Sequence, residues 1–86
     1  MMQGKTTSGF EFEVDEKRLD DMELVEAIAE SDTNPIAIMR VIKLLLGDEQ
    51  KQRLYDHLRT DDGRVPIKAA TTAVVEIFNS AKPGKN

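Results

Sequence analysis

Residues 35–46 form the most apolar stretch of the chain, and only Arg40 and Lys43 interrupt it with polar side chains. Asn34 and the proline after it mark a helix start, because asparagine caps free amides and proline at the first position gives up an amide that has no partner. Gly47 marks the end, since glycine takes the backbone conformation that closes a helix. Apolar side chains surround nearly the whole of this helix, which predicts a position at the centre of a fold.

Two interpretations of this central helix are open from the sequence. The first is burial inside the monomer. The second is a groove or seam for a partner, because each flanking helix carries few large apolar residues to cover it.

Three further helices are predicted around the central one. The first runs from its cap at Asp15 to about Ser31, and the second covers residues 48–59 with a narrow apolar stripe. After a turn over residues 60–64, the last helix opens at Val65-Pro66 and ends near residue 80. The side chains expected to face inward are Leu19, Met22, Val25, Ile28 and Ala29 in the first helix, Leu54, Tyr55 and Leu58 in the second, and Ile67, Ala70, Val74, Ile77 and Phe78 in the last.

A short strand is predicted in front of the helices. Apolar and acidic residues alternate from Phe10 to Val14, which is the period of a strand with one buried face. Such a strand needs a partner for its main chain, either the preceding segment or another subunit. We therefore predict an all-α fold, a compact bundle of about four helices with a short N-terminal β-strand. Its boundaries are a flexible segment 1–9, a single helical domain 10–81 and a flexible tail 82–86.

Composition excludes several classes of function. The chain has 86 residues, no cysteine and one histidine, so neither disulfides nor the usual zinc and thiolate sites can be assembled, and we expect no metal or cofactor. A net charge of −4 disfavours nucleic-acid binding, which requires clustered cations. No apolar run approaches the roughly 18 residues of a membrane span. We expect a cytoplasmic, non-enzymatic protein.

Three groups could suggest catalysis or ion binding. His57 has no designated nucleophile nearby, and a cation near the end of a helix explains it better. Asp61-Asp62-Gly63 resembles part of a calcium loop, but apolar residues stand where the first and last ligands belong, so a turn is favoured. The acidic residues between Asp15 and Glu30 are interrupted by Lys17 and Arg18, and we interpret them as a solvated face.

A helix-turn-helix is the alternative interpretation of the middle of the chain. Gly47 would be the turn, and residues 48–59 would be a recognition helix that offers polar side chains to a DNA groove. Acidic residues on the same helix, Asp48, Glu49 and Asp56, would face phosphates unfavourably. A small phage or plasmid DNA-binding regulator therefore stays as a second hypothesis.

Four segments carry a resemblance to a known family. They are Phe10-Glu11-Phe12-Glu13-Val14-Asp15, Leu19-Asp20-Asp21-Met22-Glu23, Val41-Ile42-Lys43-Leu44-Leu45-Leu46-Gly47-Asp48-Glu49-Gln50 and Leu58-Arg59-Thr60-Asp61-Asp62-Gly63-Arg64-Val65-Pro66. Together they resemble the tail assembly chaperones encoded in the tail gene clusters of siphophages and prophages of Gram-positive bacteria. The resemblance extends over residues 10–81, and Met22 stands where such proteins often have an aromatic residue.

The resemblance implies a chaperone that coats the long, helical tape measure protein, keeps it soluble and helps tail tube subunits assemble around it in the bacterial host cell. The implied partners are the tape measure protein, the tail tube protein and other copies of the chain. Another phage-encoded adaptor would differ only in its partner. The side chains expected at a partner or self-association surface are Ile38, Leu45, Tyr55 and Phe78, with Phe10 and Phe12 for strand pairing.

Overall fold

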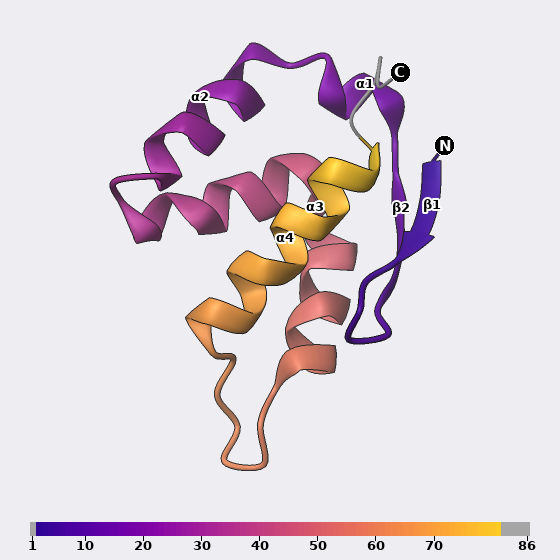
Figure 1. Cartoon of the computed structure of the whole chain (residues 1–86), viewed down its shortest axis with the longest axis vertical. Coiled ribbons are helices and arrows are strands. Elements are labelled where there is room, and N and C mark those ends of the chain that lie inside the picture. Colours follow the sequence, from indigo (N-terminus) through magenta and orange to yellow (C-terminus); the bar gives the residue numbers. More distant parts are fainter. Residues whose placement is uncertain (1, 82–86) are drawn as a thin grey trace.

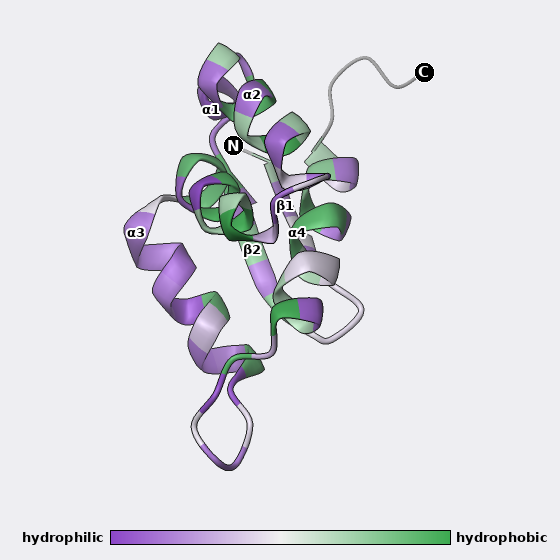
Figure 2. Cartoon of the chain, turned by 90° about the vertical axis from the view of Figure 1, so that its left-hand side faces the viewer, coloured by the Kyte–Doolittle hydropathy of each residue, from purple (hydrophilic) through white to green (hydrophobic). Residues whose placement is uncertain are grey.

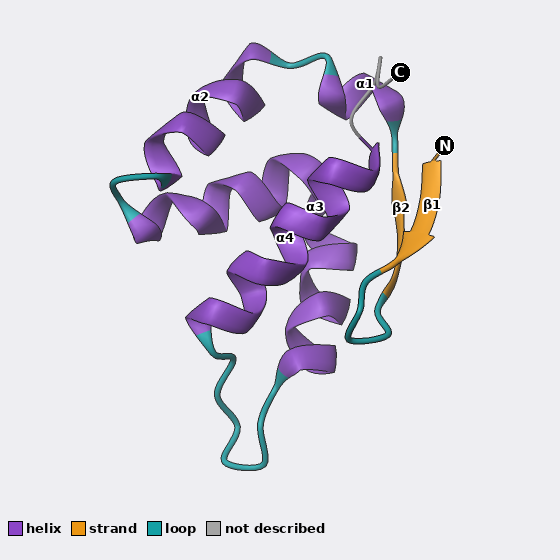
Figure 3. Ribbon diagram, viewed as in Figure 1, coloured by secondary structure: helices purple, strands orange, loops and turns teal. Residues whose placement is uncertain are grey.

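Two short strands and four α-helices make up the part of the chain that the computed structural model describes, residues 2–81 (Figures 1 and 3). In chain order they are β1 (Met2–Lys5), β2 (Glu11–Val14), α1 (Glu16–Leu19), α2 (Met22–Ser31), the 3₁₀ turn η1 (Pro35–Ala37), α3 (Ile38–Leu58) and α4 (Ile67–Ala81). The predicted mostly helical fold with an N-terminal strand is confirmed. The tail predicted for residues 82–86 lies outside the described residues.

The strands β1 and β2 pair with each other as an antiparallel hairpin, with Gly4 opposite Phe12. The predicted flexible segment 1–9 is therefore wrong for residues 2–5, which form β1. The Phe12 ring occupies the place of the side chain that Gly4 lacks, since an ideal Cβ on Gly4 would lie 2.6 Å from Phe12 Cζ. Because a glycine holds this apolar position, β1 lacks the alternating pattern that would have revealed it.

The helix predicted from Asp15 to Ser31 is interrupted. Asp15 caps α1 as expected, by accepting a hydrogen bond from Lys17 N at 3.0 Å. Asp20 then leaves the helical conformation, with φ −95° and ψ 63°, and Asp21 caps a second helix, α2. Two consecutive aspartates thus end one helix and start the next, because a short carboxylate satisfies the free amides of a new first turn.

This second cap changes which face of α2 is buried. Leu24 and Ala27 are completely buried, whereas Met22 and Val25 are 71% and 53% exposed. The predicted inward positions Met22 and Val25 are therefore wrong, while Ile28 packs against the core. The restart at Asp21 places α2 independently of α1, so the apolar stripe does not continue from one helix to the other.

The central helix begins and ends where the sequence predicts. The Asn34 side chain accepts a hydrogen bond from Ile36 N at 3.1 Å and so caps η1. At Gly47, φ is 83° and ψ is 167°, and this residue divides α3 into a first arm, residues 38–46, and a second arm, residues 48–58. Figure 1 shows the chain turning sharply between the two arms.

One core joins the hairpin to the helices. Its completely buried side chains come from β2, α2, both arms of α3, and α4, which crosses in front of α3 in Figure 1. On the side seen in Figure 2 the second arm is mostly hydrophilic, as its narrow apolar stripe predicted. In α4, Ala70, Val74 and Ile77 are buried as expected, but Ile67 is 68% exposed, which contradicts its predicted inward position. Ile67 is the first residue of α4, where the chain has just left the turn and little packs over it.

Candidate interaction surface

An apolar groove of about 360 Å³ opens where the two arms of α3 meet the start of α4. Its floor contains the buried side chains Ile42 and Ala70. Ile38 and Tyr55, both partly buried, form its walls. The remaining lining residues are Pro35, Ile36, Met39, Arg59, Val65 and Ile67. Nine of these ten side chains have no charge, so the groove offers a nearly continuous apolar surface.

The rim of the groove consists of large apolar side chains that the other residues within 2–81 leave exposed. Ile36 is 69% exposed, Met39 53% and Ile67 68%. Scattered single apolar residues on a surface need no explanation, but three that line one concave site form a contiguous patch of the kind that partner proteins cover. The local sequence places them there. Asn34 caps the 3₁₀ turn η1, which contains Ile36, and Ile67 follows Val65-Pro66 at the start of α4.

The six residues predicted for a partner surface separate into three groups. Ile38 and Tyr55 come together in the groove. Phe10, Phe12 and Leu45 are 5%, 3% and 0% exposed and belong to the core, so they offer no accessible surface. Phe78 is partly buried against the same core and does not line the groove.

The rim residues Ile36, Met39 and Ile67 were not among the residues that the sequence predicted for a partner surface. Ile36 and Met39 are three residues apart at the start of the central helix, so they share a face, and this spacing was the available signal. A helix that is apolar on all sides does not show which side its neighbours leave open.

Cations border the groove. Arg59 is the charged lining residue; it donates to Asp56 Oδ1 at 3.0 Å and to the main-chain oxygen of Gly63 at 2.9 Å. Lys51 Nζ lies 5.8 Å from the centre of the Tyr55 ring. Both charged groups lie beside the apolar floor, as charged residues do at the periphery of many protein interfaces.

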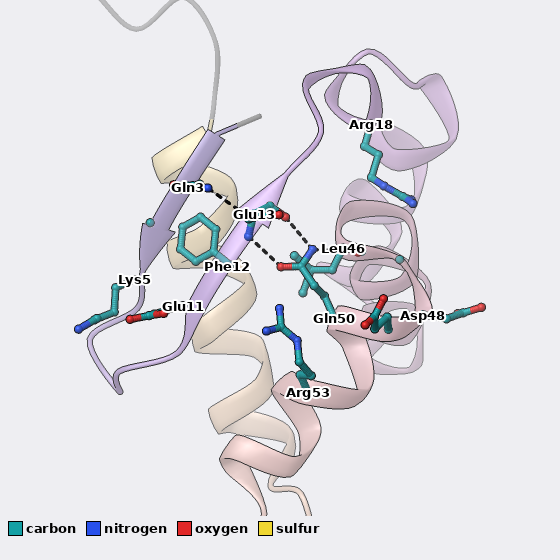
Figure 4. A pocket seen from close by; sticks show the side chains of 13 residues that line it. Gln3, Lys5, Glu11, Phe12, Glu13, Arg18, Leu46, Asp48, Gln50 and Arg53 are labelled. Carbon is teal, nitrogen blue, oxygen red and sulfur yellow. Dashed lines mark hydrogen bonds between the residues drawn. The ribbon is translucent and has the colours of Figure 1, made fainter.

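A larger, polar pocket of about 950 Å³ lies between the hairpin and the second arm of α3 (Figure 4). Gln50 Oε1 accepts from Glu13 N at 2.8 Å, and Gln50 Nε2 donates to Glu13 O at 2.6 Å and to Leu46 O at 3.1 Å. Arg18 Nη1 donates to Leu44 O at 3.2 Å. Arg18 and Gln50 thus bind two carbonyls of the last turn before the break at Gly47.

The polar pocket is crossed by hydrogen bonds that join β2 and α1 to α3. Its lining includes both cations, among them Lys5, Arg18 and Arg53, and anions, among them Glu11 and Asp48. Among residues 2–81, no group of three or more histidine or acidic side chains is placed to hold a metal ion. None of the pocket's lining side chains is a serine, threonine or histidine.

His57 attaches the hairpin turn to the second arm. Its Nε2 lies 3.0 Å from Ser8 O, and its ring centre lies 5.7 Å from that of Phe10. These contacts give the imidazole a structural role in holding the hairpin turn.

Glu76 holds the same turn from α4. Its carboxylate accepts from Thr7 N at 2.9 Å and from the Thr7 hydroxyl at 2.7 Å. These two donors, the main-chain amide first, lower the pKa of Glu76 below its ordinary value of 4.5. Because the folded pKa is lower than the unfolded one, the stabilisation is present above the unfolded pKa and is lost as the pH falls through the folded pKa.

A carboxyl NMR titration should therefore give Glu76 a midpoint below 4.5. Replacing Thr7 with valine, which removes only the hydroxyl donor, should move the midpoint part of the way back. Glu76→Gln should abolish the acid-dependent loosening of the turn, followed by amide exchange of residues 6–9. A wild-type midpoint at or above the ordinary value would contradict the contact.

The second arm of α3, the recognition helix of the DNA-binding hypothesis, has much of its polar surface engaged. Gln50 binds Glu13, and the guanidinium of Arg53 lies 5.7 Å from the Phe10 ring centre. Gln52 Nε2 donates to Asp56 Oδ1 at 3.3 Å. Gln50 and Arg53 are therefore directed toward the hairpin instead of toward a DNA groove.

No family model, curated protein or solved structure matches the chain. In addition, none of the helices within residues 2–81 has the length and apolar character needed to cross a bilayer.

Proposed function

We propose that this chain is a non-enzymatic phage tail assembly chaperone of the host cytoplasm, and that its apolar groove binds a helical segment of the tape measure protein. The single observation that carries the proposal is the groove with its exposed rim of Ile36, Met39 and Ile67. An amphipathic helix inserts side chains at positions i, i+3, i+4 and i+7 into such grooves. The resemblance supplies the partner, a long helical protein that requires masking before the tail tube encloses it.

The charge of the chain supports the same role. The net charge of −4 and the acidic residues along α1 and α2, away from the groove lining, would keep a coated partner dispersed by like-charge repulsion. Arg59 is the one charged residue among those that line the groove. A partner bound there would therefore leave the acidic surface of α1 and α2 in solvent.

Coexpression with the tape measure protein tests the proposal. The double variant Ile36→Asp, Met39→Asp places two charges on the groove rim and should weaken binding at least about tenfold, because burying an unpaired carboxylate in an apolar contact is costly. The soluble fraction of the tape measure protein should fall accordingly.

Val75→Asp is the matched control, since Val75 is 51% exposed on α4 and does not line the groove. Substitutions at exposed positions change stability by about 0.5 kcal/mol or less, so all these variants should fold. The assignment fails if the tape measure protein stays insoluble with the wild-type chain, or if the control and the rim variant reduce binding equally.

A further inference from the structure

The two edges of the hairpin differ in how their main-chain groups are satisfied. On β2, Gln50 binds both the N–H and the C=O of Glu13, so its side-chain amide takes the place of a neighbouring strand. Both main-chain groups of Glu13 are therefore already bonded and cannot pair with another strand. The bonds to Gln50 also show that the main-chain groups of Glu13 point away from β1.

The register then fixes the direction of the groups on β1. In an antiparallel pair, facing residues alternate between pairs that exchange main-chain hydrogen bonds and pairs that do not. Glu13 faces Gln3 and is bound to Gln50, so Gln3 belongs to a pair of the second kind, and so does Lys5, two residues on. The N–H and C=O groups of Gln3 and Lys5 consequently point outward along the free edge of β1.

This edge is accessible within the described part of the chain. Gln3 and Lys5 are both exposed, and Figure 1 shows β1 as the outermost element on its side of the molecule. Figure 4, from another direction, also places β1 outside β2. An open strand edge is a template for another strand.

The sequence of β1 is self-complementary about Gly4. A twofold axis through Gly4 would place Gln3 opposite Lys5 of the second copy, and Lys5 opposite Gln3 of the second copy. Each copy would then donate two main-chain hydrogen bonds and accept two, with the same residues on both sides, as an isologous contact requires.

Charge favours the same register. Along the exposed face, one row of side chains across the four strands would read Glu13, Gln3, Lys5 of the second copy and Glu11 of the second copy, with no like charges adjacent. An edge lysine ordinarily discourages pairing. Here each Lys5 has Glu11 of its own chain directly opposite it, which offsets that charge.

Gly4 also suits the axis sterically. No side chain projects from it, and the Phe12 ring of its own chain covers it. Two such glycines can face each other closely, because non-bonded pairs in antiparallel sheets have the shorter separation between strands. We propose that β1 pairs antiparallel with β1 of a second copy of this chain, forming a four-stranded sheet across a twofold axis.

Sedimentation equilibrium of the full chain over a concentration series tests the dimer. Gln3→Pro removes the outward N–H and leaves the bonds to β2 in place, since proline is tolerated where a strand edge faces solvent. Gln3→Thr is the control: it retains the N–H and, like the proline variant, loses the bond from Gln3 Nε2 to Glu13 Oε2. Wild type and Gln3→Thr should dimerise, and Gln3→Pro should dimerise at least about tenfold more weakly, because two symmetry-related hydrogen bonds are lost.

Amide exchange of the wild-type protein tests the dimer without depending on whether a variant folds. Protection of the Gln3 and Lys5 amides should rise with protein concentration, while the groove variant Ile36→Asp, Met39→Asp should leave this rise unchanged. A monomer at every concentration, or rapid exchange of both amides independent of concentration, would overturn the proposal. Equal dimerisation of wild type and a folded Gln3→Pro variant would do the same.

Discussion

Replacing Leu45 with alanine should lower the free energy of unfolding by about 2–5 kcal/mol, the usual cost of removing a large aliphatic side chain from a core. Leu45 is 0% exposed and lies on the first arm of α3. A domain of this size has a total stability of roughly 4–13 kcal/mol, so the loss is a large part of it. Urea denaturation followed by circular dichroism should show a lower midpoint with an unchanged slope.

Met39→Ala is the control for Leu45→Ala, because Met39 lies on the same arm and is 53% exposed. Its free energy of unfolding should stay within about 0.5 kcal/mol of wild type. The pair also separates folding from binding: Leu45→Ala should weaken partner binding only in proportion to the unfolded fraction. If Leu45→Ala leaves stability unchanged, the first arm is not the centre of the core.

Local chemistry explains why the element boundaries could be predicted. Asp15 and Asn34 each accept a hydrogen bond from an amide two residues further on, which is a short-range interaction that the sequence displays directly. Gly47 and Gly63 both have positive φ, at 83° and 90°, where L side chains are rarely found. Such features depend on the nearest neighbours along the chain.

The wrong predictions concern segments whose structure depends on residues that are distant in the sequence but adjacent in space. Asp21 has the same residue type as Asp20, so the sequence does not distinguish them, whereas in the structure Asp21 caps α2 and Leu24 is buried in the core. Gly4 can be recognised as an inward-facing strand position only from the structure, in which the Phe12 ring of β2 packs against it. A pattern along one segment carries no information on such pairings.

The candidate site was predicted in part for the same reason. Ile38 and Tyr55 were expected at a surface, and the turn at Gly47 brings their two arms together around the groove. The rim residue Ile67 was expected inside because it is apolar, but the sequence does not reveal that no element within residues 2–81 packs over it. Exposure of an apolar side chain is a property of the assembled fold.

Replacing Gly47 with alanine should lower the free energy of unfolding by about 1–3 kcal/mol, because φ 83° and ψ 167° lie in a region that only glycine populates readily. A rearrangement to a continuous helix would relieve the unfavourable backbone conformation but would not restore the lost stability. A continuous helix would redirect the second arm, and Gln50 would then lose Glu13 while Arg53 would leave Phe10. Urea denaturation of the variant measures the loss.

A double-mutant cycle with Arg18→Ala separates the backbone from the steric contribution at Gly47. A Cβ on Gly47 would lie 2.9 Å from Arg18 Nη2, which is the mobile end of a long side chain. We therefore expect a coupling of less than about 0.5 kcal/mol, with most of the loss persisting when Arg18 is replaced. Full recovery of stability in the double variant would assign the cost to the contact with Arg18. An unchanged stability of Gly47→Ala would show that the two arms do not meet at a conformation that requires glycine, and the groove between them would lose its physical basis.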